Sequence, residues 1–107
     1  MANNLYEIIV YSENQVGLLS TIANIFTRRS LNIDSLRVFP SDIKGIHKFT
    51  IKTRASEEEV IRTVKQIEKK VDVVKAFYQV DDERSNREME LVQEFLFNRE
   101  KENVENK

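Results

Sequence analysis

The chain has 107 residues, with 17 Lys and Arg side chains against 18 Asp and Glu. This length suits one small domain, and a formal net charge of −1 gives no basic footprint of the kind that nucleic-acid-binding modules carry. The sequence has no cysteine and one histidine, His47, which excludes disulfides, thiolate zinc sites and a His-rich metal cluster.

The N-terminal residues lack the basic stretch and the long apolar stretch of a signal peptide. The longest unbroken apolar run is 8–11, which is far too short to cross a membrane. We therefore expect a cytoplasmic protein that does not bind membranes.

The first 30 residues predict a strand followed by a helix. Leu5 to Tyr11 is rich in β-formers and predicts a strand that is buried on one face and partly on the other. After Asn14, apolar residues recur every three or four positions and predict a helix of roughly 14 residues that ends at Arg28-Arg29. The predicted apolar stripe consists of Val16, Leu19, Ile22, Ile25 and Phe26.

Two strands joined by a hairpin are predicted next. The first runs from Asn32 to Pro40, where proline stops it, and the residues from Ser41 to Gly45 form the loop. Ile46 to Thr53 alternates, so that every second side chain shares a face. The apolar-side set is His47, Phe49, Ile51 and Thr53, and the solvent-side set is Lys48, Thr50 and Lys52.

A second helix and a fourth strand complete the pattern. Ser56 and Glu59 have the spacing of a capping box, and the apolar stripe Val60, Val64, Ile67 and Val71 follows. Asp72 to Asp82 predicts the last strand. Its two predicted faces are Val74, Ala76, Tyr78 and Val80 on one side and Val73 and Phe77 on the other.

The element order β-α-β-β-α-β predicts an α+β fold of the ferredoxin-like class. Two crossovers place both helices on one face of a four-stranded antiparallel sheet. We assign residues 1–82 to this domain and residues 83–107 to a C-terminal extension. In the extension, Met89, Val92, Phe95 and Leu96 have helical spacing, so a short helix and then a disordered end are expected.

Most residues that could have a catalytic or binding role are explained equally well or better by a structural role. His47 lacks partners for a catalytic triad, and Glu57 to Glu59 suit the first turn of a helix. Arg28-Arg29 is explained by a solvated helix C-terminus, which we favour over a site for a phosphate or a carboxylate. No nucleophile with a base and no phosphate-binding loop is recognisable.

The junction between the first strand and the first helix has a more specific pattern. Asn14 precedes the helix and Gly17 lies in its first turn, where glycine costs about 1 kcal/mol relative to alanine. Helix N-terminal amides form an anion site, and a carboxylate would fit there. Asn32 supplies a second amide from this subunit or a neighbour. The alternative is that Asn14 is only an N-cap and Gly17 only a packing glycine.

The residues around this junction resemble a known family. Two stretches, 13–20 (ENQVGLLS) and 26–36 (FTRRSLNIDSL), are similar to the ACT domain of the regulatory small subunit of acetolactate synthase, which is also called acetohydroxyacid synthase. The similarity continues through 69–75 (KKVDVVK) and covers about residues 5–82. Residues 87–92 resemble the segment that follows the ACT domain in these subunits.

The resemblance implies a non-catalytic regulatory subunit. Its ACT domain would form a homodimer side by side and bind a branched-chain amino acid, usually valine, at the dimer interface. It would activate the large catalytic subunit and confer feedback inhibition on it. Thiamine diphosphate, magnesium and flavin would belong to that catalytic partner, so no cofactor is expected here. The resemblance implies effector-binding roles for Asn14, Gln15, Val16, Gly17, Leu18, Asn32 and Ile33.

Two departures from the family pattern keep alternatives open. Many members have glycine where Ser30 stands, which predicts a different turn before Asn32. Longer members continue into a second domain, whereas this sequence stops at Lys107, so valine control could be weaker here. The alternatives are a free-standing ACT sensor that acts on a different enzyme and an assembly or activator subunit that has lost its ligand.

Overall fold

The fold is taken from a computed structural model, which describes residues 3–13, 15–81, 92 and 94–99. The elements are β1 (Asn4–Ser12), α1 (Gln15–Arg28), β2 (Ser35–Pro40), β3 (His47–Ala55), α2 (Glu57–Glu68) and β4 (Val73–Val80). The predicted order β-α-β-β-α-β is therefore confirmed.

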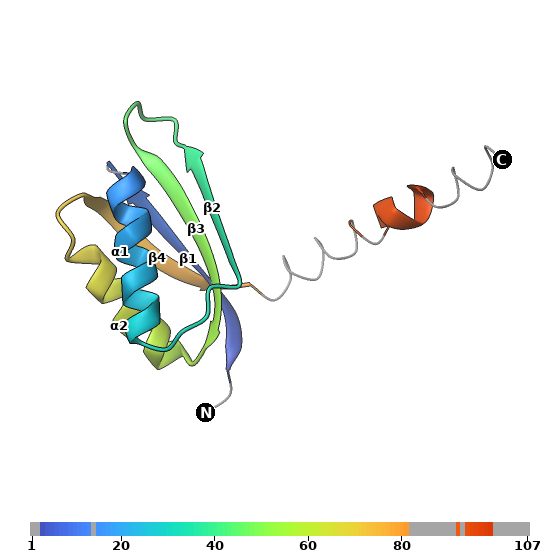
Figure 1. The fold of residues 1–107 in the computed structure, drawn as a ribbon, viewed down its shortest axis with the longest axis horizontal. Helices are drawn as coiled ribbons and strands as arrows, with labels where there is room; N and C mark the ends of the chain where they lie inside the picture. Colours follow the sequence, from blue (N-terminus) through green and yellow to red (C-terminus); the bar gives the residue numbers. More distant parts are fainter. Residues whose placement is uncertain (1–2, 14, 82–91, 93, 100–107) are drawn as a thin grey trace.

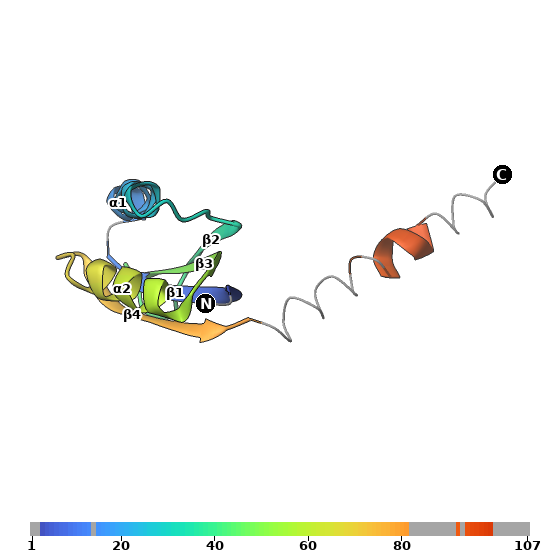
Figure 2. The same cartoon turned by 90° about the horizontal axis from the view of Figure 1, so that it is seen from below.

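The four strands form one antiparallel sheet in the order β2-β3-β1-β4. Both helices lie on the same side of this sheet (Figures 1 and 2). Each helix follows one strand and returns the chain to the next, which is the split β-α-β arrangement of the ferredoxin-like class. The strands β2 and β4 form the two edges, and the opposite side of the sheet, which we call the open face, is not covered by either helix.

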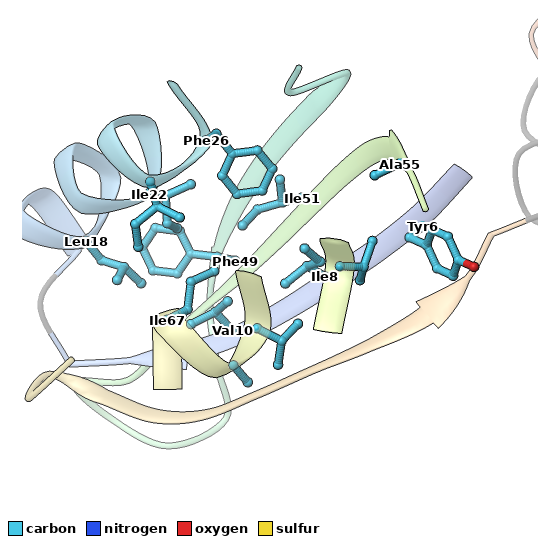
Figure 3. Close-up of a cluster of buried hydrophobic side chains, with 14 residues drawn as sticks. Tyr6, Ile8, Val10, Leu18, Ile22, Phe26, Phe49, Ile51, Ala55 and Ile67 are labelled. Atoms are coloured by element: carbon cyan, nitrogen blue, oxygen red, sulfur yellow. The ribbon is translucent and has the colours of Figure 1, made fainter. Parts of the chain in front are cut away.

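The hydrophobic core fills the space between the sheet and the two helices (Figure 3). Alternate residues of β1 and β3 point into it, because side chains along a strand alternate between the two faces. Several core side chains are almost fully buried: Ile8, Val10, Ile22, Phe26, Phe49, Ile51, Val60 and Ile67. The predicted faces of the third strand are confirmed, with Phe49, Ile51 and Thr53 buried and Lys48, Thr50 and Lys52 on the other side.

Each predicted helix stripe is wrong at one end. Val16 is 79% exposed, and Leu18 is buried in the first turn of α1 instead. Val71 is 99% exposed, because α2 already ends at Glu68 and the chain then turns toward β4. Periodicity does not show where a helix leaves the core, so both stripes were extended too far.

The turn after α1 corrects the expectation based on Ser30. The Ser30 amide donates to the Thr27 carbonyl (3.1 Å) and the Leu31 amide donates to the Phe26 carbonyl (2.9 Å). These two bonds form a Schellman motif, in which the residue at the position of Ser30 adopts a left-handed conformation. Ser30 does so, with φ of 58°. The chain thus makes a glycine-type turn without glycine.

Two of the strands are shorter than predicted. The second begins at Ser35 instead of Asn32, although the Asp34 amide already donates to the Lys52 carbonyl at 2.7 Å. The fourth spans Val73–Val80 instead of Asp72 to Asp82. In β4, Ala76 and Tyr78 pack toward the core, whereas Val74 and Val80 are 61% and 49% exposed.

The solvent-side prediction for Lys52 was wrong in part. Its Nζ atom lies 3.0 Å from Oδ2 of Asp81, and the two side chains are 15% and 0% exposed. Asp81 follows β4 directly, and its amide donates to the carbonyl of Leu5 at 3.0 Å. The ion pair and this backbone bond fix the end of the fourth strand against the rest of the sheet.

Beyond the sheet, the structure describes residues 92 and 94–99, which are helical; we call them the C-terminal helix. Met89 and the predicted disordered end, residues 100–107, lie outside the described residues, as does the proposed boundary at 82–83. Figures 1 and 2 show the C-terminal helix apart from the sheet and from α1 and α2. Across the described part of the chain, none of the helices has the length and apolar character needed to span a membrane.

Candidate functional site

The start of α1 is held at one end of the sheet. Two bonds converge on the carbonyl of Asp72, one from the Ser12 hydroxyl and one from the Glu13 amide, each at 3.0 Å. Asp72 lies in the turn that leads into β4. The end of β1 and the start of β4 are therefore tied together directly below the first turn of α1.

The first turn of α1 contains no acidic residue. Gln15 and Val16 are exposed, Gly17 is partly buried and Leu18 is 2% exposed. A helix N-terminus carries the positive end of the helix dipole, which favours a negatively charged group there. Asn14, the predicted ligand or cap residue, lies outside the described residues, so its role stays a prediction.

The other predicted site residues follow the far end of α1. Asn32 is exposed, and its backbone carbonyl accepts a 2.6 Å hydrogen bond from the hydroxyl of Thr53 in β3. Ile33 is partly buried and packs against the core. The Schellman turn before them and this hydrogen bond together fix the backbone of Asn32 in the segment that leads into the edge strand β2.

Gly17 and Asn32 do not come together within one chain. The helix between them has 14 residues, which corresponds to about 20 Å at 1.5 Å per residue. Figure 1 shows the start of α1 and the segment leading into β2 at opposite ends of the domain. The structure brings together Gln15 to Leu18, but a single site that includes Asn32 would need a second chain.

The predicted site residues line neither of two hollows on the described surface. One hollow, of about 550 Å³, lies at the hairpin end of the open face and is lined by residues that include Tyr11, Ile43, Lys48 and Lys75. The other, of about 160 Å³, lies over the centre of that face beside Glu7. Within the described residues, no three His, Cys, Asp or Glu side chains gather as metal ligands.

Arg29 and His47, which the sequence analysis did not include in the candidate site, each lie in a distinctive environment in the structure. Arg29 was interpreted as a residue of a solvated helix end, but its Nε donates to Oε1 of Gln66 at 2.8 Å, and its Nη1 lies 3.7 Å from Glu59. It therefore joins α1 to α2. The Nδ1 atom of His47 is buried, and among the described residues it has no hydrogen-bond partner. No periodicity in the sequence could have indicated the Arg29–Gln66 pair, because 37 residues separate its members.

The sheet order and the two helices on one face define a ferredoxin-like domain of the ACT type. A solved ACT domain, from the GTP pyrophosphokinase of Chlorobium tepidum, has this fold with a TM-score of 0.61 and 15% identity, covering 73% of this chain and all of that one. Residues 8–75 match the family described as the AHAS small subunit-like ACT domain. The chain belongs to this family.

Individual relatives agree with this assignment. The chain is 35% identical over 80 residues to the acetolactate synthase small subunit of Buchnera aphidicola subsp. Baizongia pistaciae, which covers 75% of this chain and 50% of that protein. It is also similar to the crystal structure of the acetolactate synthase small subunit of Thermotoga maritima, with 28% identity and a TM-score of 0.63. That match covers 70% of this chain and 47% of the other. The chain thus spans about half the length of these relatives.

Proposed function

We propose that this chain is a non-catalytic regulatory subunit of acetolactate synthase that works in the cytoplasm. It forms a homodimer through its ACT domain, activates the large catalytic subunit and transmits feedback inhibition by valine or another branched-chain amino acid. Membership of the small-subunit family supports the proposal that the partner is the large catalytic subunit of acetolactate synthase. The main support for an effector site at the dimer interface is that Gly17 and Asn32 lie at opposite ends of one helix. These two residues can therefore share a site only if they come from different chains.

The register of the sheet explains how two chains would complete one site. Ser12 pairs with His47, and His47 pairs with Pro40, so α1 starts at the Pro40 end of β2. Asn32 lies near the Ser35 end. If two copies of the edge strand β2 meet antiparallel about a two-fold axis, the Ser35 end of one faces the Pro40 end of the other. Asn32 of each copy then approaches the α1 N-terminus of its partner.

The edge strand has a surface suited to such a partner. Leu36 and Phe39 of β2 are 37% and 52% exposed, and the outer backbone groups of an edge strand are available for pairing. A side-by-side pair would continue the sheet from four to eight strands. The two halves of each effector site would then be held by the same contact that makes the dimer.

The ligand chemistry follows from the residue types. The carboxylate of the amino acid is placed at the first amides of α1, near Gln15 and Gly17, where the helix dipole favours negative charge. The exposed side chain of Val16 and the partly buried Ile33 offer apolar surface for a branched side chain. Leu18 lies in the core and supports this surface from below.

Regulation requires a difference in affinity. An effector shifts an equilibrium only when it binds one arrangement more tightly than another. In this proposal the two arrangements differ at the dimer interface, because the effector contacts both chains there. The catalytic subunit then responds to the relative position of the two ACT domains.

The test is a mixing experiment with two variants, Gly17→Asp and Asn32→Ala. Each homodimer would lose both of its sites. In a mixed dimer one site contains both substitutions and the other contains neither. After random exchange of a 1:1 mixture, calorimetric titration with valine should recover about a quarter of the wild-type sites. Isoleucine and leucine titrations would then identify the preferred effector.

Other outcomes separate the remaining possibilities. No recovery after subunit exchange, verified by mass-tagged chains, would show that the two residues do not share a site across the interface. If wild-type dimers bind no branched-chain amino acid but still raise the rate of the purified large subunit, the chain is an activator without a ligand. If it binds an amino acid but does not copurify with the large subunit, it is a sensor for another enzyme.

A further inference from the structure

Arg29 connects the end of α1 to α2. Its backbone amide donates to the carbonyl of Ile25 at 3.1 Å, so its backbone still belongs to the last helical turn. Its side chain reaches the other helix, where Nε donates to Oε1 of Gln66 at 2.8 Å and Nη1 lies 3.7 Å from Oε2 of Glu59. Glu59 and Gln66 lie two turns apart on α2. One side chain therefore fixes the end of α1 against a two-turn stretch of α2.

The contacts of Arg29 are more shielded from solvent than the ion pair within α2. The side chains of Arg29 and Glu59 are 27% and 35% exposed, whereas those of Arg62 and Glu58 are 56% and 51% exposed. Exposed ion pairs contribute little, because water and salt screen them. A guanidinium group also presents its donors in a fixed plane, so it can hold two partners with little further loss of side-chain freedom. The position of Arg29 relative to α2 is thus well defined.

Arg29 directly precedes the turn that places Asn32. In this Schellman turn the Ser30 amide donates to the carbonyl of Thr27, and Ser30 has φ of 58°. The Asn32 carbonyl then accepts the 2.6 Å hydrogen bond from the hydroxyl of Thr53. The backbone of Asn32 is therefore anchored to β3 on one side and, a few residues earlier in the chain, to α2 through Arg29. A change in the position of α2 relative to α1 would reach Asn32 through this short segment.

From these contacts we propose that Arg29 is a positioning residue that couples the effector site to α2. It does not touch the effector and acts through the turn that holds Asn32. Coupling between two parts of a protein is reciprocal. If α2 sets the position of Asn32, an effector bound to Asn32 also changes the position of α2, and occupancy of the dimer interface is transmitted to the second helix. This inference rests on the proposed function, because it assumes that an amino acid binds at Asn32.

The first test compares the valine affinities of Arg29→Met and Arg62→Met, measured by calorimetric titration of the full-length protein. Methionine keeps an apolar stem and removes the charge and the donors of arginine. Arg29→Met should weaken valine binding about fivefold or more, the lower limit of typical allosteric couplings. Arg62 also contacts Glu59, at 3.4 Å, but from within α2. Arg62→Met should therefore change the affinity by less than about twofold. Equal affinity in Arg29→Met and the wild type would overturn the proposal.

A double variant tests whether Arg29 acts through Gln66. Gln66→Met removes the acceptor on α2 and leaves α1 unchanged, so it should also weaken valine binding. If the two residues act through their hydrogen bond, the loss in Arg29→Met with Gln66→Met should be smaller than the product of the two single losses. A loss equal to that product would show that the residues act independently, and the coupling would be wrong. Gln66→Met also carries the test if thermal unfolding shows that Arg29→Met does not fold.

The side-chain amide of Gln66 gives a direct readout of the coupling. Its NMR signal should shift when valine saturates the wild-type protein, because its Oε1 accepts the bond from Arg29. The side-chain amide of Gln79, which donates to Glu7 at 3.2 Å on the open face, should keep its position. In Arg29→Met at saturating valine, the Gln66 signal should move much less, whereas a purely structural role of Arg29 would lower stability without removing this response. An unchanged Gln66 signal in the saturated wild-type protein would contradict the proposal.

The effector site and the coupling fail in different ways. If the wild-type protein binds none of valine, isoleucine and leucine, the effector site is wrong, and the coupling is wrong with it. If it binds valine, but the Gln66 signal is unchanged and Arg29→Met binds as tightly as the wild type, the effector site stands and only the coupling is wrong. Weaker binding by Arg29→Met together with a shift of the Gln66 signal in the wild type is the result that supports both.

Discussion

The two helices cover the same face of the sheet, but they begin differently. The start of α2 is stabilised by its own residues: the hydroxyl of Ser56 accepts a 3.2 Å hydrogen bond from the Glu59 amide, and the first turn contains three glutamates. Glu58 also binds Arg62 at 2.7 Å. The first turn of α1 contains no acidic residue, and instead contains an exposed valine and a glycine.

The acidic start of α2 also contacts the sheet. The hydroxyl of Tyr78 in β4 donates to Oε1 of Glu57 at 3.5 Å. Partial burial of the ring and the nearby Glu57 carboxylate raise the pKa of Tyr78. Negative charge at this helix start is thus supplied from within the chain. In α1, the first turn supplies none, and this difference underlies the proposed site for an external carboxylate.

Substitutions in the core should have the largest effects and should affect both helices alike. Ile22 of α1 and Ile67 of α2 are both 0% exposed. Replacing either with alanine should lower the free energy of unfolding by about 2–5 kcal/mol, measured by urea denaturation. Val71→Ala, at a position 99% exposed, serves as the control and should change it by less than about 0.5 kcal/mol. A cost below about 1 kcal/mol for Ile22→Ala alone would mean that α1 is packed less firmly than α2.

Gly17→Asp makes the start of α1 resemble that of α2. We expect at least a tenfold loss of valine affinity, because the new carboxylate occupies the place of the ligand carboxylate and repels it. The fold should remain, and the free energy of unfolding should stay equal or rise by up to about 1 kcal/mol, since an acidic residue replaces glycine in a first helical turn. Calorimetric titration and thermal unfolding measure the two effects.

Gly17→Ala separates the added charge from the added volume. It adds a Cβ atom without a charge, so it should retain more affinity than Gly17→Asp if repulsion is the main cause. Valine binding by Gly17→Asp at wild-type affinity would contradict the placement of the carboxylate at this helix start.

Ser56→Ala removes the N-cap of α2. The expected loss is about 1 kcal/mol, or a decrease of about 4–8 °C in Tm for a domain of this size, because the Glu59 amide loses its acceptor. Ser20→Ala changes an exposed serine within α1 and should leave Tm equal or slightly higher. Equal losses in both variants would indicate that the hydroxyl of Ser56 does not stabilise the helix.

Ser30→Gly should have the smallest effect, a gain of up to about 1 kcal/mol. Ser30 has φ of 58°, where a side chain is strained and glycine is not. Lys69, the C-cap residue of α2, has φ of −74°. At this φ, glycine relieves no backbone strain, and it increases the conformational entropy of the unfolded chain. Lys69→Gly should therefore reduce stability by about 0.5–1 kcal/mol. Thermal unfolding of the two variants should shift in opposite directions.

The sequence alone determined the fold class and the element order. Alternation in β3, the capping box at Ser56 and the helical stripe of α1 each depend on contacts between near neighbours, and such contacts leave periodic patterns. The same patterns could not show that Val16 and Val71 lie outside the core, because burial depends on where the sheet lies. The motif around Gly17 and Asn32 was recognisable as a set, and the predicted helix already placed these residues at its two ends. The sequence did not show whether Asn32 could reach Gly17 within one chain.

The tertiary structure decided which distant residues meet. The pairs Arg29–Gln66 and Lys52–Asp81 join segments about 30 or more residues apart, and no local pattern encodes such pairs. The ion pair between Arg54 and Asp34 likewise forms only when β2 and β3 are aligned in register. Local sequence specifies each element through short-range energetics, whereas charge complementarity and shared sites depend on a three-dimensional arrangement that only the packed core fixes.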